Sequence, residues 1–122
     1  MDIILRPQSE EPLYKQIYGQ IVSQIADGSL ANGEALPSVR SAARYLGVAI
    51  ITVKTAYEEL EKDGFIYTVP AKGCFVSSNA AQVAEQTRVF AEKACEDFLT
   101  VCKKSGLKDE DILSIVKEQL RR

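Results

Sequence analysis

The segment LPSVRSAARYLGVAIITVKTAY, residues 36–57, decides the fold of this chain. Ser38 is a suitable N-cap for a first short helix, and Gly47 is suited to a tight turn before a second helix. Two helices with apolar faces, joined by such a turn, form a helix-turn-helix, which can place its second helix in the major groove of DNA. The segment contains no acidic residue and three cationic ones, Arg40, Arg44 and Lys54. It therefore predicts a DNA-binding element.

The residues on both sides of this segment complete a small helical core. Upstream, apolar residues recur every four positions, which predicts a helix that begins near Pro12 and ends before Gly28. These residues are Leu13, Ile17, Ile21 and Ile25. The second helix of the motif is expected over residues 50–63, and Gly64 ends it. Its predicted buried side chains are Val53, Ala56, Tyr57 and Leu60.

Two short apolar runs follow, at residues 65–69 and 74–76, on either side of Pro70-Ala71-Lys72-Gly73. Apolar runs around such a turn signal predict a β-hairpin. Three helices and a hairpin make a winged helix-turn-helix domain, expected over residues 1–78. The predicted fold class is mainly α with a small β-hairpin.

The remaining residues, 79–122, have the pattern of two amphipathic helices. The first is expected to continue to about Ser105, Gly106 breaks it, and Asp109 is expected to cap the second. Helices of this total length bury too little surface to be stable alone. We therefore expect a helical dimerisation segment. Its predicted interface residues are Val83, Phe90, Ala94, Phe98, Val101, Ile112, Ile115, Val116 and Leu120.

Composition limits the other classes of function. With 122 residues, 46% apolar and 26% charged, the chain is typical of a folded protein. No apolar run approaches the roughly 20 residues that span a bilayer, and the N-terminus is a poor secretory signal, so we expect a cytoplasmic location. Histidine is absent, and the three cysteines, Cys74, Cys95 and Cys102, lack metal-ligand spacing. We expect free thiols, no metal and no cofactor.

An enzyme is disfavoured because the chain has no histidine base and no glycine-rich phosphate loop, and its carboxylates follow solvated helix faces. The net charge of −2 argues mildly against a nucleic-acid partner. However, charges act over a Debye length of about 8 Å at physiological salt, and the nearest acids, Glu58, Glu59, Glu61 and Asp63, lie beyond the predicted contact segment. Local charge therefore leaves the DNA-binding prediction in place.

Several short stretches of the sequence match, in the same order, the pattern of one protein family. They are PLYKQI (12–17), GSL (28–30), LPSVR (36–40), LGV (46–48), TV (52–53), AYEELE (56–61), GFIY (64–67), KG (72–73) and FV (75–76). In these residues the chain resembles the GntR family of bacterial transcription regulators, specifically its YtrA-like subgroup. The resemblance covers nearly all of residues 8–77, and the tail is similar to that subgroup's two-helix dimerisation segment. It implies a homodimeric repressor that binds an inverted-repeat operator, often one that controls a neighbouring transporter operon.

The resemblance also implies which residues contact DNA. Arg40, Thr52 and Lys54 match contacting positions, and a guanidinium suits either phosphate or guanine. A cation and a glycine at the hairpin turn can approach the minor groove. The alternatives are a surface ion pair for either arginine, a solvated face for Thr52 and Lys54, and an inert turn. The candidate DNA-binding residues are Ser38, Arg40, Arg44, Ile50, Ile51, Thr52, Lys54, Lys72 and Gly73, and no small-molecule effector can be named.

Two departures from the family pattern bear on this site. The family has mainly polar residues where this chain has Ala49, Ile50 and Ile51. Ala49 cannot cap a helix, and a lost cap costs about 1 kcal/mol. The isoleucines can pack on thymine methyls, or one can turn into the core. Ala71 stands where the family favours glycine, which makes a positive φ less favourable there. A winged-helix module that binds proteins instead of DNA therefore remains the alternative function.

Overall fold

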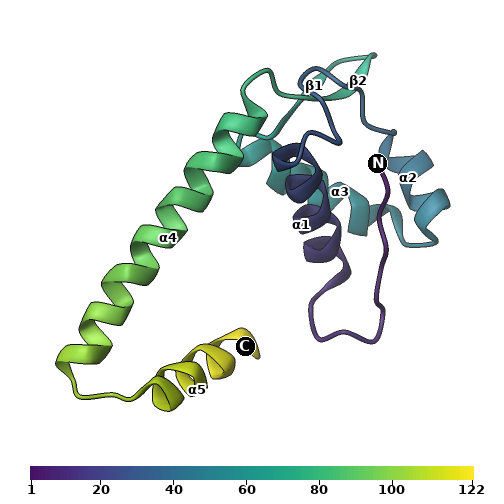
Figure 1. The fold of residues 1–122 in the computed structure, drawn as a ribbon. Helices are drawn as coiled ribbons and strands as arrows, with labels where there is room; N and C mark the ends of the chain where they lie inside the picture. Colours follow the sequence, from purple (N-terminus) through teal and green to yellow (C-terminus); the bar gives the residue numbers. More distant parts are fainter. The chain divides into compact units, whose positions relative to one another are not determined.

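The structure, a computed structural model, describes all of residues 1–122, which form two compact units, Met1–Glu85 and Gln86–Arg122. The elements of the first unit are α1 (Leu13–Ala26), α2 (Val39–Leu46), α3 (Ile50–Lys62), β1 (Ile66–Val69) and β2 (Gly73–Val76). Helix α4 (Ala80–Lys104) begins in the first unit and continues into the second, which also contains α5 (Asp109–Leu120) (Figure 1). The predicted fold class, mainly helical with one hairpin, is confirmed.

The boundary between the units lies after Glu85 and not after Ser78, where the sequence predicted it. The reason is that α4 contributes to the first core: Ala80 and Ala84, on its first turns, are buried among the residues of the winged domain. The first residues of the segment expected at 79–122 therefore belong to the first unit.

Helices α1 and α3 pack against each other and form the centre of this core. Ile17, Ile21 and Ile25 of α1 are almost fully buried, and Leu13 is half-buried at the start of the stripe. The predicted inner face of α3 is also confirmed, with Val53, Ala56, Tyr57 and Leu60 all buried.

The helix-turn-helix has the predicted ends. The Ser38 hydroxyl oxygen accepts a hydrogen bond from the Ser41 amide at 3.1 Å, so Ser38 caps α2. Gly47 then takes a left-handed conformation, with φ of 70°, which only glycine adopts without strain. Ala49 precedes α3 in an extended conformation without a side-chain cap, as its chemistry predicted.

The hairpin gains a third strand-like segment that the sequence did not predict. Strands β1 and β2 pair antiparallel, with Ile66 opposite Val76 and Val69 opposite Gly73. On the other edge of β2, residues 33–36 form three backbone hydrogen bonds, which place β2 in the middle. The donors and acceptors are Gly33 N to Val76 O (2.8 Å), Val76 N to Glu34 O (2.8 Å) and Leu36 N to Cys74 O (2.9 Å). This segment has no apolar alternation, so the sequence carries no strand signal there.

The N-terminal segment is fastened to α1 by a ladder of glutamines, another feature that the sequence analysis missed. Gln16, Gln20 and Gln24 lie one turn apart on one face of α1. The Gln20 amide accepts from Ile4 N (2.9 Å) and donates to Ile4 O (2.7 Å). Gln16 accepts from Arg6 N (2.8 Å) and donates to Arg6 O (3.0 Å) and to Glu11 O (2.8 Å). Gln24 donates to Asp2 O.

The spacing of the ladder follows from backbone geometry. Four helical residues rise about 6 Å, and two extended residues span about 6.6 Å, so every fourth helix position meets every second residue of the segment. The alternate side chains, Met1, Ile3 and Leu5, pack against the hydrophobic core. The glutamine side chains thus hydrogen-bond the backbone of residues 2–6 as a neighbouring strand would.

In the second unit, α5 follows α4 after a short turn at residues 105–108, where Gly106 has a φ of 76° (Figure 1). Cys102 and Ile112 are buried on either side of this turn, and Leu107 is half-buried. Asp109, expected as the cap of α5, is its first helical residue instead. Lys108 occupies the cap position, and its amide donates to the Asp111 carboxylate at 3.0 Å.

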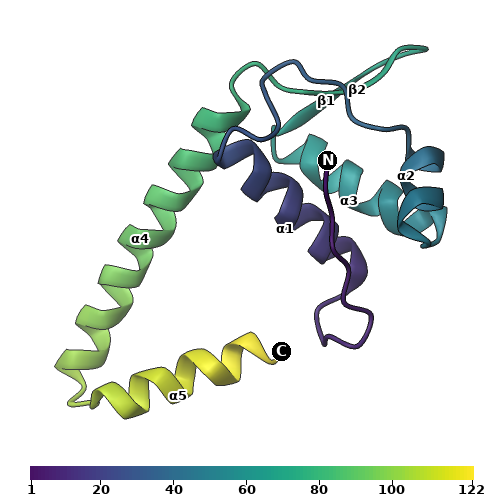
Figure 2. The same cartoon turned by 45° about the vertical axis from the view of Figure 1, so that its right-hand side comes forward.

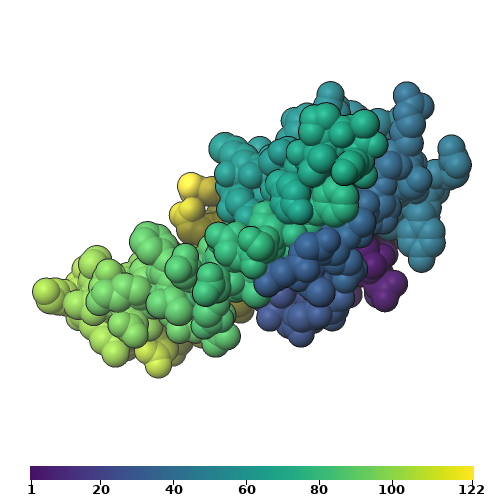
Figure 3. All heavy atoms as spheres, turned by 90° about the horizontal axis from the view of Figure 1, so that it is seen from above, coloured from purple at the N-terminus to yellow at the C-terminus, as the bar shows by residue number.

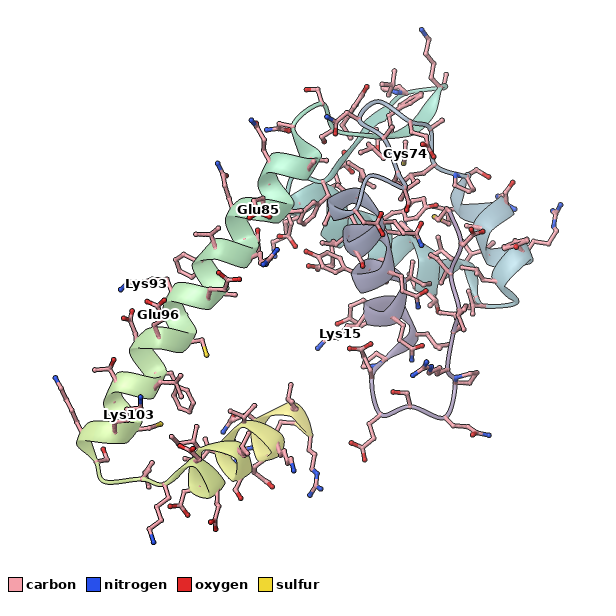
Figure 4. The ribbon with its side chains drawn as sticks, in the orientation of Figure 1. Lys15, Cys74, Glu85, Lys93, Glu96 and Lys103 are labelled. Atoms are coloured by element: carbon pink, nitrogen blue, oxygen red, sulfur yellow. The ribbon has the colours of Figure 1, made fainter.

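The predicted dimer-interface residues differ in their exposure. Ile112 is buried within its own chain, and Val83 and Phe98 are half-buried. The other predicted residues are exposed: Phe90, Ala94, Val101, Ile115, Val116 and Leu120. Val89 and Leu113 are exposed large apolar residues that the sequence analysis did not include. Lys93 and Glu96 lie on the side of α4 away from α5 (Figure 4). The second unit thus presents an apolar surface that its own helices leave exposed.

The three cysteines are free, with Cys74 half-buried, Cys95 exposed and Cys102 buried. Cys74 lies on the side of the hairpin that faces the helices (Figure 4). None of the helices is both long enough and apolar enough to cross a membrane.

Candidate nucleic-acid interface

Two arginines lie on the solvent face of α2. Arg40 and Arg44 are one helical turn apart and exposed, while Ala42 and Ala43 between them are buried in the core. No carboxylate lies within 4.0 Å of either guanidinium, so the ion-pair alternative has no counterpart in the structure. Both guanidinium groups are available to an external anion.

The first turns of α3 combine two exposed isoleucines with a cation. Ile50 and Ile51 are 46% and 64% exposed, so neither turns into the core. Thr52 is half-buried, and the Lys54 ammonium is exposed, 3.9 Å from the Glu58 carboxylate on the next turn. Such a surface pair is worth about 0.3–0.5 kcal/mol, so a phosphate can displace it. The helix N-terminus adds unpaired amides and a positive dipole, with no acid in its first turn.

The hairpin turn has a positive φ at Ala71, a conformation that is unfavourable for alanine. The Lys72 amide donates to Val69 O at 3.0 Å, which closes a four-residue turn. Ala71, at the third position of this turn, has a φ of 67° and is the one non-glycine residue of the chain with positive φ. Gly73 follows with a φ of 112°. Lys72 is exposed and has no carboxylate within 4.0 Å.

The fold brings these three groups to one side of the first unit. In two views, the hairpin tip, α2 and the start of α3 all lie on the side away from the start of α4 (Figures 1 and 2). Side chains around residue 40 project from the edge of this unit in the space-filling view (Figure 3). The candidate residues therefore share one surface, although they come from three elements.

Tyr57 supports this surface without belonging to it. Its ring is buried, and its hydroxyl donates to Pro37 O at 2.9 Å. Burial raises the pKa of the Tyr57 hydroxyl, which therefore stays protonated as a donor. The predicted core role is confirmed, and the hydrogen bond ties α3 to the turn that begins α2.

One exposed aromatic residue was missed. Tyr45 is 77% exposed on α2, next to Arg44, and it lines a hollow of about 670 Å³ beside the helix-turn-helix turn. The signal was in the sequence, because Tyr45 falls between the buried positions of the α2 pattern. A phenol on this face can donate to a phosphate oxygen.

With this geometry established, comparison with known proteins identifies the family. The family model described as "Bacterial regulatory proteins, gntR family" matches residues 13–76, which is more than half of the chain. The chain belongs to the GntR family. The match extends from the start of α1 to the end of β2 and so includes the whole helix-turn-helix and hairpin.

Relatives place this GntR protein in the YtrA-like subgroup. The HTH-type transcriptional repressor YtrA of Bacillus subtilis is 30% identical over 117 residues, covering 95% of this chain and 90% of the relative. The crystal structure of a transcriptional regulator from Oenococcus oeni is 32% identical with a TM-score of 0.68, covering 98% and 97% of the two chains.

A third similar structure is that of the AraR DNA-binding domain in complex with operator ORX1. It is 28% identical, with a TM-score of 0.56, and the match covers 63% of this chain and 96% of the other. The fold and the family are therefore those of transcription regulators that use a DNA-binding winged helix.

Proposed function

We propose that this GntR regulator is a homodimer that represses transcription by binding an inverted-repeat operator through α3 and the hairpin turn 70–73. The observation that carries the proposal is a local excess of positive charge on a chain with a net charge of −2. Arg40, Arg44, Lys54 and Lys72 are exposed, and the one carboxylate within 4.0 Å of any of them is Glu58, in a surface pair with Lys54. From the resemblance to its subgroup, we expect it to act in the cytoplasm on a transporter-type operon.

Dimerisation is proposed because one winged domain makes few base contacts. Two linked domains bind two half-sites in one event, which raises affinity without any new contact type. The apolar surface of α4 and α5 supports this proposal, since it includes Phe90 and Leu120, which are 76% and 79% exposed. Covering such side chains is favourable at about 25 cal/mol per Å² of apolar area.

The test is the salt dependence of binding to the DNA upstream of its own gene. In a dimer each protomer contributes these four cations, so binding would release about eight counterions. The slope of log K against log salt concentration would then be near −7. Lys72→Gln should weaken binding and make this slope smaller in magnitude by about 2, because each protomer loses one phosphate contact.

Lys15→Gln is the matched control. It removes the same charge from α1, on the side away from α2 (Figure 4), and should leave the slope unchanged. Equal effects of Lys15→Gln and Lys72→Gln would contradict the proposed surface.

The exposed Ile50–Ile51 pair favours one alternative, a winged-helix module that binds another protein. That function would not require the cations, so binding would not weaken steeply as salt rises. A flat salt response, or no binding to upstream DNA at all, would support this alternative.

A further inference from the structure

The start of α3 carries an apolar surface that the fold does not use. Ile50 and Ile51 are adjacent, exposed and absent from the core and from the residues packed against it. Ile51 lines a hollow of about 330 Å³ between the N-terminal ends of α1 and α3. Single exposed aliphatic residues are common, but two neighbouring ones on an element that the proposed function places in a groove require an explanation.

The surroundings of the pair indicate what covers it. The charged residues of the helix-turn-helix, residues 36–57, are Arg40, Arg44 and Lys54, all exposed, and the nearest acid, Glu58, forms only a surface pair with Lys54 at 3.9 Å. A small exposed apolar pair on a motif whose charged residues are all cationic is complementary to a polyanion that also presents methyl groups. The major groove of DNA has this composition, since phosphates border it and thymine places a C5-methyl in it.

The chemistry of isoleucine then selects among the bases. An aliphatic side chain has no donor or acceptor, so it cannot pair with guanine O6 and N7 or with the amino group of cytosine. Placing it on those edges would leave desolvated polar groups without partners, which is unfavourable. Of the four bases, only thymine offers an apolar group in the major groove.

We infer that Ile50 and Ile51 read thymine methyl groups, so that each operator half-site contains at least one thymine packed against this pair. The inference rests on the proposed DNA-binding function and adds a sequence preference to it. Polar contacts from Arg40 and Lys54 remain for phosphates or guanine at neighbouring positions. Selectivity at the start of α3 is thus obtained from apolar contact instead of hydrogen bonds.

The test uses the full-length protein and duplexes selected by it from a random 20-bp library. Each thymine of the selected sequence is replaced in turn by deoxyuridine, which lacks only the 5-methyl group, and the Kd is measured at fixed salt. Loss of one buried methyl should weaken binding about fourfold, and loss in both half-sites about fifteenfold. Thymines elsewhere in the duplex should show no such effect.

Protein variants assign the effect to the isoleucines. Ile50→Ala and Ile51→Ala are exposed substitutions to a better helix former, so the fold should be retained. The paired variant should bind the thymine and deoxyuridine duplexes equally. Lys72→Gln is the control, since it should weaken binding to both duplexes by the same factor and preserve the methyl effect.

The outcomes separate the two proposals. If no sequence is enriched from the library, the proposed DNA-binding function fails. If sequences are enriched but deoxyuridine binds as well as thymine at every position, the function stands and the methyl readout is overturned. A methyl effect that persists when both isoleucines are alanine also overturns it.

Discussion

Two alanines occupy backbone positions that suit other residues, and each gives a prediction at the residue scale. Ala71 has a φ of 67° at the third position of the hairpin turn. A left-handed conformation destabilises an L-residue in the folded state by about 1–2 kcal/mol. Glycine avoids this strain, but its greater freedom in the unfolded chain opposes folding by about 0.4–1 kcal/mol. Ala71→Gly should therefore raise the free energy of unfolding by about 0.5–1 kcal/mol in urea denaturation.

Ala81→Gly is the matched control for that measurement. Ala81 is exposed in the first turns of α4 and has no positive φ, so glycine there should lower the stability. If the two variants change the stability in the same direction, backbone strain at Ala71 is not the cause.

Ala49 gives the second prediction, because it takes the N-cap position of α3 without a capping side chain. Ala49→Ser should add a side-chain acceptor for the free amides and raise the free energy of unfolding by about 1 kcal/mol. Ser38→Ala, which removes the observed cap of α2, should lower it by a similar amount. Chemical denaturation of the three proteins measures both changes, and a neutral result for Ala49→Ser would show that α3 begins elsewhere.

At the scale of elements, the glutamine ladder determines whether residues 2–6 stay ordered. Gln16 is buried and makes two hydrogen bonds to the backbone of Arg6 and a third to Glu11 O. Gln16→Ala should cost about 1–2 kcal/mol and remove the exchange protection of the Arg6 amide. Hydrogen exchange reports this directly. Gln8→Ala, at an exposed position off the ladder, should leave that protection intact.

The helices could be predicted from the sequence, whereas these backbone attachments could not. The apolar repeat that includes Ile17 and Ile21 has a helical period, so the core face of α1 was visible in the sequence. The partners of Gln20 and Gly33 lie far along the chain, and no local pattern specifies them. Likewise, Ala80 looked like part of the tail because its pattern is helical, and only packing shows that it belongs to the first core.

For the candidate site, the sequence indicated the residue types, but it did not indicate which side chains are exposed or which lack a charged partner. From its position in the sequence, Ile51 could either be exposed or turn into the core, and the structure shows that it is exposed. The pairing of Lys54 with Glu58 follows from their spacing of four, while the absence of a partner for Arg40 required coordinates. DNA contacts by these residues stay predictions.

At the scale of the whole molecule, the assembly prediction is tested on the full chain. Phe90→Asp with Leu120→Asp places charges on the exposed apolar surface of the second unit, and we expect a monomer in sedimentation velocity. The monomer should bind the operator far more weakly, because each half-site is then bound separately. The control is Glu96→Ala, on the side of α4 away from α5 (Figure 4), which should remain dimeric.

A truncation that tests the second unit should end the chain at Glu85, the last residue of the first unit. Removing all residues after Ser78 would also remove Ala80 and Ala84 and open the first core, so loss of binding would have two causes. A protein that ends at Glu85 keeps that core. If this shortened protein remains dimeric, the second unit is not the interface.

The strand-like segment at residues 33–36 has a consequence for behaviour outside the native state. By occupying the outer edge of β2, it leaves the sheet with two short open edges, that of β1, which is four residues long, and that of residues 33–36 itself. Open edges are templates for intermolecular pairing and aggregation. A substitution that releases this segment, such as Gly33→Val at a φ of 81°, should therefore make the protein precipitate on heating instead of unfolding reversibly.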